Sequence, residues 1–332
     1  MVLTVPHLRG TGADVSRSVV CGSWRLKKPL IGNVHCGPMH RELKRGDLLV
    51  TAVAVLLAGA LAGHGLLPEG SGISQLVESF LPWLAVPVVL LAVVAGLLRS
   101  RIGLCAALLP ALVCAVLVVP DLVVLPEGGT GELRVATQNL GAGGNAAELT
   151  GNDLVSLQEV TDRNRTAVAR TLRPKLRYHV DVGTVGLWSR YPVSAPDRLD
   201  LGQGWPRALR ATVHLPDGPA TVYAAHLASV RFGDVERRNR TLTELTELIT
   251  SDRSPRLILL GDLNTASTDR ALRPMLDSVR EARSGPGFTW PSAFPLTRPD
   301  HILIRGFRTA AASVRATTGS DHLAAIAALG AP

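Results

Sequence analysis

The feature that most constrains this chain of 332 residues is a long stretch that is almost free of charge. Residues 47–125 contain only six of the 62 charged side chains, and three apolar runs lie within them, at 48–67, 80–98 and 102–125. Each run reaches the roughly 18–20 residues that a helix needs to cross a hydrocarbon core of about 30 Å. Because a backbone in lipid has to satisfy its own hydrogen bonds, we expect three transmembrane helices here, with buried helices of a soluble protein as the alternative.

Basic residues beside these runs indicate how the helices are oriented. Arg41, Lys44 and Arg45 precede the first run, and Arg99 and Arg101 separate the second run from the third. The segment between the first two runs and the segment after the third contain no Lys or Arg. Since Lys and Arg favour cytoplasmic loops, the sequence predicts a multi-pass protein of the cell membrane with a cytoplasmic N-terminus and an extracellular C-terminal domain.

This pattern divides the chain into four parts. We expect a basic, disordered cytoplasmic tail at 1–46, membrane helices at 47–125, a linker at 126–132 and a separate domain at 133–332. Met39 precedes a basic segment that leads into the first apolar run, so it is an alternative natural start. Cys114 is the last of the four cysteines, which excludes a disulfide or a thiol nucleophile from the C-terminal domain.

The C-terminal domain combines many short apolar strands with few helices. Helices are expected at 162–171 and at 234–251, where Asp234 suits the N-cap and several leucines share one face. Strands are expected at 133–140, 153–160, 177–182, 185–193, 208–215, 220–227, 256–264 and 300–307. This content predicts an α/β sandwich, in which packed sheets carry helices on their outer faces.

The charge of this domain does not identify its function. It has 25 Lys and Arg against 19 Asp and Glu, a net charge of +6 with histidine neutral. A modest positive charge is compatible with a polyanionic substrate. It equally reflects the arginine bias of the whole chain.

The sequence Gly-Asp-Leu-Asn at 261–264 ends one of the apolar strands. In an extended chain, residues two positions apart point to the same face, so Asp262 and Asn264 are expected side by side at the strand end. A carboxylate beside an amide suits a hard cation or a phosphate. An ordinary Asx turn is the alternative.

Polar groups of the same kinds stand at the ends of other predicted elements. These are Asn139, Glu159, His226, Asp300, Asp321 and His322. Each has a structural explanation by itself, but together they favour a site, because burying them unpaired is costly. Carboxylate and amide oxygens suit Mg²⁺, whereas two histidines without a thiolate disfavour a zinc site. With an imidazole beside a carboxylate as a general base, the set predicts metal-assisted hydrolysis of a phosphate ester.

The order of these motifs resembles a known family. Over roughly residues 133–329, the chain reads TQNL, LQEV, AHL, GDLN, RPDHIL and SDH, which is similar to the endonuclease/exonuclease/phosphatase superfamily. That superfamily includes pancreatic-type deoxyribonuclease, abasic-site endonucleases, neutral sphingomyelinases and inositol polyphosphate phosphatases. The resemblance implies a four-layered α/β sandwich of two packed mixed sheets flanked by helices, and a divalent-metal phosphoesterase.

The resemblance also implies how the metal and the phosphate are held. Glu159 is expected to be the principal ligand of Mg²⁺, with Mn²⁺ as an alternative, and Asn139 and Asp321 to complete or orient the metal shell. Asp262 is expected near the nucleophilic water, and Asn264 as a donor to the scissile phosphate. One-metal and two-metal schemes both fit these residues.

The remaining residues of the series are expected to act on protons and charge. The resemblance implies that His322 is a general base or orients the phosphate, held by Asp300. It implies that His226 stabilises the transition state or protonates the leaving group. Arg207 matches an arginine that contacts substrate phosphate in some members, and an ordinary exposed arginine is the alternative.

These observations lead to one principal function and one alternative. The principal prediction is a membrane-anchored, outward-facing, Mg²⁺-dependent phosphodiesterase or phosphatase. Extracellular nucleic acid is the first substrate class, and phospholipid headgroups are the second, because the anchor holds the domain near a bilayer. The alternative is a catalytically inactive binding or signalling module with the same fold.

Overall fold

The computed structural model describes residues 44–332, except 69, 71 and 231–233. Almost all of the predicted cytoplasmic tail at 1–46 lies outside the described residues, as does the alternative start at Met39. Residues 45 and 46, which the prediction assigned to the tail, already belong to the first helix.

The charge-poor region forms helices, two of which are long and apolar enough to cross a membrane. These are α1 (Arg45–Gly63), continued by the 3₁₀ turn η1 (His64–Leu66), and α4 (Arg101–Leu122). The second predicted span is divided between η3 (Leu81–Leu84) and α3 (Ala85–Leu97). A further short helix, α2 (Ile73–Ser79), precedes η3 in a segment expected to be a loop. Helix α2 meets the helical segment Leu81–Leu97, formed by η3 and α3, at an angle of 72°. A third span therefore requires that this bent pair cross the membrane as one unit.

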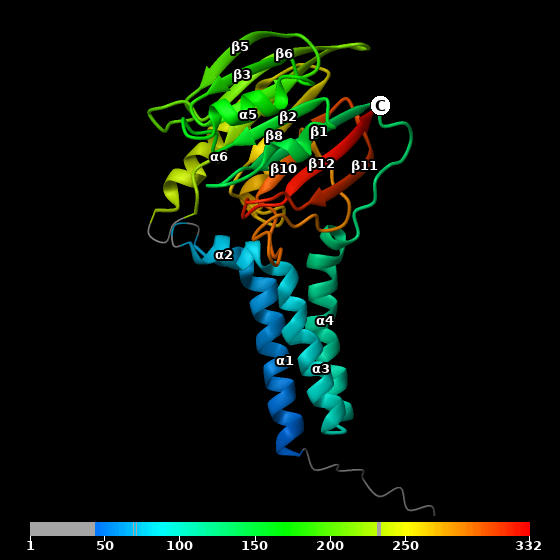
Figure 1. Ribbon diagram of the computed structural model, residues 1–332. Helices are drawn as coiled ribbons and strands as arrows, with labels where there is room; N and C mark the ends of the chain where they lie inside the picture. Colours follow the sequence, from blue (N-terminus) through cyan, green and yellow to red (C-terminus); the bar gives the residue numbers. More distant parts are fainter. Residues whose placement is uncertain (1–43, 69, 71, 231–233) are drawn as a thin grey trace, which may run out of the picture. The chain divides into compact units, whose positions relative to one another are not determined.

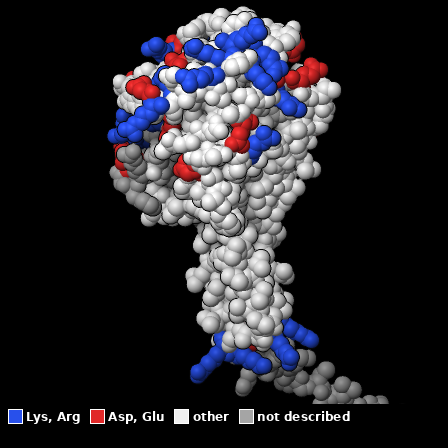
Figure 2. Space-filling model, in the orientation of Figure 1, with Lys and Arg blue, Asp and Glu red and all other residues white. Residues whose placement is uncertain are grey.

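Helices α1, α3 and α4 lie side by side (Figure 1). Small side chains are buried where they meet, among them Ala54, Ala95 and Ala107, which allows the backbones to approach closely. Large aliphatic side chains such as Leu56 and Leu108 point outward and are exposed. Figure 2 shows Lys and Arg gathered where α1 begins, α3 ends and α4 begins.

Residues after the linker form two six-stranded sheets. The first has the order β11-β12-β1-β2-β4-β3, with β1 (Leu133–Asn139), β2 (Leu154–Gln158), β3 (Tyr178–Val182), β4 (Val185–Ser189), β11 (Arg308–Arg315) and β12 (Ala324–Gly330). The second has the order β5-β6-β7-β8-β10-β9, with β5 (Val193–Leu199), β6 (Ala208–Leu215), β7 (Gly218–His226), β8 (Leu257–Asp262), β9 (Arg280–Glu281) and β10 (Asp300–Arg305). Each sheet contains one parallel pair, β1 with β2 and β7 with β8, among antiparallel neighbours.

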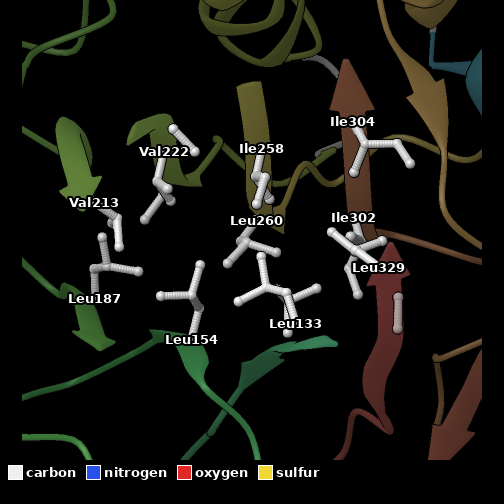
Figure 3. Close-up of a cluster of buried hydrophobic side chains, with 14 of the residues drawn as sticks. Leu133, Leu154, Leu187, Val213, Val222, Ile258, Leu260, Ile302, Ile304 and Leu329 are labelled. Atoms are coloured by element: carbon white, nitrogen blue, oxygen red, sulfur yellow. The ribbon is translucent and has the colours of Figure 1, made fainter. Parts of the chain in front are cut away.

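The main hydrophobic core lies between the two sheets (Figure 3). Leu133, Leu154 and Leu187 come from the first sheet, while Leu260 and Ile302 face them from the second. All five are buried, and strands β2, β4 and β8 are buried along their whole length. The continuous aliphatic run of β8 is typical of a strand that is covered on both faces.

Helices cover the outer face of each sheet. Val168 and Leu172 of α5 (Arg165–Leu172) pack with Trp188 against the first sheet. The second sheet is covered by α6 (Glu236–Ser251) and by the short turns η5 (Arg270–Leu272) and α7 (Arg273–Leu276). The first sheet also carries the 3₁₀ turn η4 (Ala146–Leu149). The prediction of two packed mixed sheets with flanking helices is confirmed.

The predicted and observed elements differ where the sequence pattern of a strand or helix is weak. All eight predicted strands form, but β5, β9, β11 and β12 were not predicted as strands. Strand β11 is rich in alanine, which has a low strand propensity, and β5 is exposed along most of its length. The N-cap of α6 is Val235, not Asp234 as expected; Asp234 instead lies 3.6 Å from Arg237.

Candidate active site

The polar residues predicted from the strand ends meet at one edge of the two sheets. Strands β1 and β2 are parallel and end there with Asn139 and, one residue after β2, Glu159. In the second sheet, His226 at the end of β7 and Asp300 at the start of β10 both pair with Asp262 of β8. These polar side chains of both sheets therefore lie close together, at corresponding edges of the two sheets.

These side chains line a pocket of about 580 Å³. Seven of the predicted residues line it, namely Asn139, Glu159, His226, Asp262, Asn264, Asp321 and His322. Asp300 is fully buried behind His322. A volume of this size is typical of sites that bind small molecules.

The amide of Asn139 joins the two sheets at the pocket. Its Nδ2 donates hydrogen bonds to Glu159 Oε1 at 3.2 Å and to Asp262 Oδ2 at 3.0 Å. Its Oδ1 accepts from the backbone N–H of Gly141 at 2.9 Å, which fixes the orientation of the amide. Asn139 thus holds two carboxylates, one from each sheet, side by side.

His322 and Asp300 form a hydrogen-bonded pair at the wall of the pocket. His322 Nδ1 lies 2.8 Å from Asp300 Oδ2, which also accepts from Thr289 Oγ1 at 2.6 Å. The ring nitrogen that remains for a substrate or water is Nε2. Burial alone lowers the pKa of His322, but the carboxylates of Asp300, Asp262 and Asp321 outweigh burial and raise the pKa to about 9.

His226 has the opposite electrostatic environment. Burial lowers its pKa to about 4, and although Asp262 opposes the shift, the positive charge of Arg207 adds to it. The imidazole is therefore neutral at physiological pH. Its Nε2 lies 3.6 Å from Asp262 Oδ2, which brings it next to the carboxylate pair.

Arg207 lies against His226 and does not line the pocket. Its guanidinium contacts Nδ1 of His226 and lies 5.0 Å from the ring centre of Trp205. Burial also lowers the pKa of Arg207. In this arrangement its charge acts on His226, and the predicted contact with a substrate phosphate would require the side chain to move.

Asp262 and Asn264 form an Asx turn, and both residues also line the pocket. Asp262 Oδ1 accepts the backbone N–H of Asn264 at 2.9 Å, which is the Asx hydrogen bond of the alternative interpretation. Asp262 Oδ2 is directed to Asn139 and His226. The amide of Asn264 donates to the Leu227 carbonyl at 3.0 Å, so this donor holds the neighbouring loop.

Strained backbone occurs at two of the pocket residues. Glu159 has a φ of 60° and Asn264 a φ of 47°, in the left-handed region that residues with a Cβ rarely adopt. The Glu159 carbonyl accepts a hydrogen bond from Asn164 Nδ2 at 3.0 Å, which helps to hold this conformation. Such outliers persist where the surroundings determine the geometry, and they cluster at functional sites.

Asp321 lies at the exposed rim of the pocket, where two loops cross. A Cβ on Gly141 would come within 2.8 Å of Asp321 Oδ1, and Gly141 has a φ of 55°, so a glycine is required there. Ser320 Oγ donates to the Asn139 carbonyl at 2.7 Å and accepts from the His322 N–H at 3.0 Å. The loop that carries Asp321 and His322 is thereby fixed to the end of β1.

The donors around the pocket suit a hard divalent cation. Glu159, Asp262 and Asp321 supply carboxylate oxygens, and the elevated pKa of His322 reflects how strongly this acidic surrounding stabilises positive charge. Donor atoms of Asp262, Asp300 and His322 lie within 4.8 Å of one another. Because Asp300 and His322 already bond to each other, Glu159 and Asp262, joined through Asn139, are the better pair of oxygen ligands.

Sequence reasoning did not find several residues at this site. Thr289, which bonds to Asp300, gives no signal in the sequence, since it lies in an irregular segment. The pocket is also lined by Leu76 of α2 and by Phe80, which directly follows this helix; the prediction assigned these residues to a loop and to a membrane span. Their contact with the site depends on packing between segments that are far apart in the chain.

Comparisons with known proteins agree with this arrangement. Residues 120–322 match the sequence model of the Endonuclease/Exonuclease/phosphatase family, which covers more than half of the chain. The chain belongs to the Endonuclease/Exonuclease/phosphatase family, and the predicted recognition of this domain is confirmed. Members of this family are phosphodiesterases, nucleases and phosphatases. A comparison with curated protein sequences finds no significant match.

Solved structures are similar to this chain at low sequence identity. An endonuclease/exonuclease/phosphatase from Bacteroides vulgatus has a TM-score of 0.50 at 16% identity, covering 60% of this chain and 99% of its own. A humanised D. rerio TDP2 with 14 mutations has a TM-score of 0.50 at 15% identity, covering 60% and 98%. Sphingomyelinase C from Streptomyces griseocarneus has a TM-score of 0.47 at 18% identity, covering 59% and 98%.

Proposed function

We propose that this protein is a metal-dependent hydrolase of phosphate esters whose active site is the pocket at the ends of β1, β2, β7 and β8. The observation that carries the proposal is the convergence of two carboxylates and a histidine–aspartate pair from both sheets on one pocket. Acids that hold a cation beside an imidazole that exchanges a proton are the groups that phosphoester hydrolysis requires.

In this proposal the carboxylates of Glu159 and Asp262 would hold Mg²⁺ or Mn²⁺, Asn139 would orient them, and Asp321, which lines the same pocket, would complete the metal shell. Hard oxygen ligands of this kind suit both ions. When bound, the cation would neutralise charge on the phosphate and polarise its oxygens. Asn139 keeps the two carboxylates adjacent through its hydrogen bonds to both.

The histidines have different tasks in the proposed reaction. His322, held by Asp300, is protonated near neutral pH, so its Nε2 would donate to a phosphate oxygen, and it would take the proton of the attacking water only after it has lost its own. Neutral His226, next to Asp262, donates a hydrogen bond to the oxygen on which charge develops. Asn264 positions the loop after β7 through Leu227, which keeps His226 in place.

We further propose that α1, α4 and the bent pair α2–α3 anchor the domain in the cell membrane. Exposed aliphatic side chains along these helices support this proposal. Lys44, Arg45, Arg99 and Arg101 gather at one end of the helices, which favours that end on the cytoplasmic side and the catalytic domain outside.

The experiment that tests the proposed chemistry compares two histidine variants. The full chain in detergent is assayed with bis(4-nitrophenyl) phosphate and Mg²⁺. His322→Ala is expected to lower the rate of 4-nitrophenol release by at least about 100-fold, because the water and the phosphate lose the imidazole. His214→Ala removes an exposed histidine on β6, away from the pocket, and is expected to retain the rate.

Two results would contradict the proposal. Equal rates in His322→Ala and the unaltered protein would exclude this histidine from the reaction. A folded protein that binds Mg²⁺ but hydrolyses no phosphate ester would favour the alternative, a binding module that keeps the fold without the activity.

A further inference from the structure

Helix α2 forms one wall of the proposed active-site pocket. Leu76 of α2 and Phe80 after it line the same cavity as Glu159, Asp262 and His322. In the chain, α2 lies between α1 and α3, two of the helices proposed to lie in the membrane. Residues of the proposed anchor therefore supply one side of the pocket lining. Figure 1 shows α2 where the membrane helices adjoin the sheets.

Polar contacts hold α2 against the loop that follows β8. Glu78 pairs with Arg270 at 3.4 Å and accepts the Arg270 backbone N–H at 3.2 Å. The Glu78 carbonyl accepts from Thr268 Oγ1 at 2.5 Å, and Arg270 Nη2 donates to the Leu67 carbonyl at 2.6 Å. Because Thr268 lies four residues after Asn264, this docking fixes α2 relative to the catalytic groups.

The two faces of α2 are the reverse of those in a water-soluble helix. Its polar residues Ser74, Gln75 and Glu78 are buried against the protein, whereas Ile73 and Leu76 are 52% and 46% exposed. Soluble helices bury their apolar face and expose the polar one. An outward apolar face is stable where the surroundings are hydrocarbon, so α2 suits a membrane surface.

The pocket has apolar as well as polar lining. Besides the catalytic groups, Leu76, Phe80, Val230 and Trp290 supply apolar surface. Among the described residues, no Lys or Arg lines this pocket. A nucleic-acid backbone is bound mainly through Lys and Arg, so this lining disfavours the nucleic acid that was the first substrate expected from the sequence.

We infer that the substrate is a membrane lipid whose phosphate ester reaches the catalytic groups while its hydrocarbon lies along Leu76 and Phe80 of the α2 wall. This inference rests on the proposed hydrolysis and names its substrate class. In the reaction, a water oxygen forms a bond to phosphorus, the bond between phosphorus and the ester oxygen breaks, and the released alcohol takes up a proton. The lipid need not leave the bilayer completely, because the wall of the site belongs to the anchor.

The test uses two chromogenic phosphate diesters that differ only in one alkyl group. The full chain in mixed micelles is given hexadecyl 4-nitrophenyl phosphate or methyl 4-nitrophenyl phosphate, and kcat/KM is measured from 4-nitrophenol release. The unaltered protein is expected to prefer the hexadecyl ester by at least about tenfold, because its alkyl chain is buried on the apolar wall.

A matched pair of leucine variants separates the pocket from general contact with the micelle. Leu76→Asn places an amide in the apolar wall and is expected to lower the hexadecyl-to-methyl ratio by about tenfold. Leu66→Asn changes a leucine that is 89% exposed in η1 and lies outside the pocket, so its ratio is expected to stay within about twofold. If Leu76→Asn does not fold, Leu76→Ala shortens the same side chain and is expected to lower the ratio less.

The outcomes distinguish the inference from the function on which it rests. If neither ester is hydrolysed, or if His322→Ala hydrolyses both at the unaltered rate, the proposed function itself is wrong. Hydrolysis of the methyl ester that depends on His322, with a hexadecyl-to-methyl ratio near one, would show that only the lipid inference is wrong. The same conclusion would follow if a folded Leu76 variant had the same hexadecyl-to-methyl ratio as the unaltered protein. Faster cleavage of a single-stranded oligonucleotide than of the hexadecyl ester would also overturn it.

Discussion

At the scale of single residues, the pocket concentrates features that oppose folding. Glu159 and Asn264 adopt left-handed backbone conformations, and Asp300 Oδ1 is buried without a hydrogen bond from any described residue. Three carboxylates also line one cavity. Each of these raises the free energy of the folded state, and such features cluster at functional sites. We therefore expect activity and stability to respond in opposite directions at this site.

Glu159→Gln tests this opposition. The amide keeps the size of the side chain but removes a charged ligand, so Mg²⁺-dependent hydrolysis is expected to fall by at least about 100-fold. The melting temperature without metal is expected to stay the same or to rise, because one like charge leaves the pocket. Asp162→Asn, three residues further along, changes an exposed acid and is expected to alter neither quantity. A clear loss of melting temperature in Glu159→Gln would show a structural role for the carboxylate.

At the scale of elements, strands β7 and β8 have to approach closely to bring His226 and Asp262 together. Gly261 makes this possible, because a Cβ at this position would come within 2.1 Å of the Ala225 carbonyl oxygen. The glycine of the Gly-Asp-Leu-Asn sequence is thus required by the packing of the two strands, whose last residues, His226 and Asp262, line the pocket.

Gly261→Ala is expected to separate these strands. The added methyl group meets backbone that cannot give way easily, so the free energy of unfolding should fall by about 1–3 kcal/mol. Hydrolysis should fall as well, because Asp262 and His226 move apart. Gly151→Ala is a suitable control, since nothing lies within 4 Å of a Cβ at that position. Unchanged thermal unfolding and activity in Gly261→Ala would show that the strands tolerate the methyl group.

The end of α6 is tied to the second sheet by Asp252. Its carboxylate accepts hydrogen bonds from Tyr223 at 2.7 Å and from Arg210 at 3.0 Å, and one from the Ser254 N–H at 2.7 Å. Burial opposes ionisation of this acid, but these hydrogen bonds outweigh burial and lower its pKa to about 2. A lowered folded-state pKa stabilises the protein above the ordinary value near 3.8, and this contribution is lost as pH falls toward 2.

Asp252→Asn is therefore expected to lower the free energy of unfolding by about 2 kcal/mol at pH 7. The difference from the unaltered protein should shrink between pH 4 and pH 2, where Asp252 itself becomes protonated. Thermal unfolding of the full chain in detergent at several pH values measures both effects. Asp197→Asn on exposed β5 is the matched control. A destabilisation that is independent of pH would mean that packing, and not charge, is responsible.

The success of sequence analysis depended on the kind of signal each element carries. Strand β8 was predicted from the run of aliphatic residues that precedes Gly-Asp-Leu-Asn, and β2 and β4 were predicted from short apolar segments. Helix α2 was missed because its polar residues are buried and its apolar residues exposed, which reverses the usual pattern. The pocket-lining residues at strand ends were named from residue type and order, whereas Thr289 and the α2 wall arise from contacts between distant parts of the chain.

At the scale of the whole molecule, the proposed anchor is joined to the catalytic domain by specific contacts. Arg283 donates to Asp121 Oδ1 at 2.7 Å near the end of α4, and to Glu281 Oε2 at 2.6 Å. Trp83 of η3 donates to the Leu296 carbonyl at 2.8 Å and lies 6.0 Å from the ring of Phe288. These contacts reach the segment between β9 and β10, which also carries Thr289 of the site.

Arg283→Ala tests this connection. It leaves Asp121 without its arginine partner and removes one of the cations around Glu281, so the free energy of unfolding is expected to fall by about 3 kcal/mol. Arg280→Ala removes an exposed partner of Glu127 and is expected to change stability by less than about 1 kcal/mol. Thermal unfolding in detergent compares the two. Equal effects would show that Arg283 does not hold the parts together.

If the pocket hydrolyses phosphate esters with the help of a divalent metal, removal of the metal should abolish the activity. The full chain is treated with EDTA, and the initial rate of hydrolysis of bis(4-nitrophenyl) phosphate is measured before and after Mg²⁺ or Mn²⁺ is returned. We expect the rate to fall by at least about 100-fold with EDTA and to recover when the metal is returned, but not to recover in Glu159→Gln. A rate that EDTA leaves unchanged would show that the hydrolysis does not depend on a divalent metal.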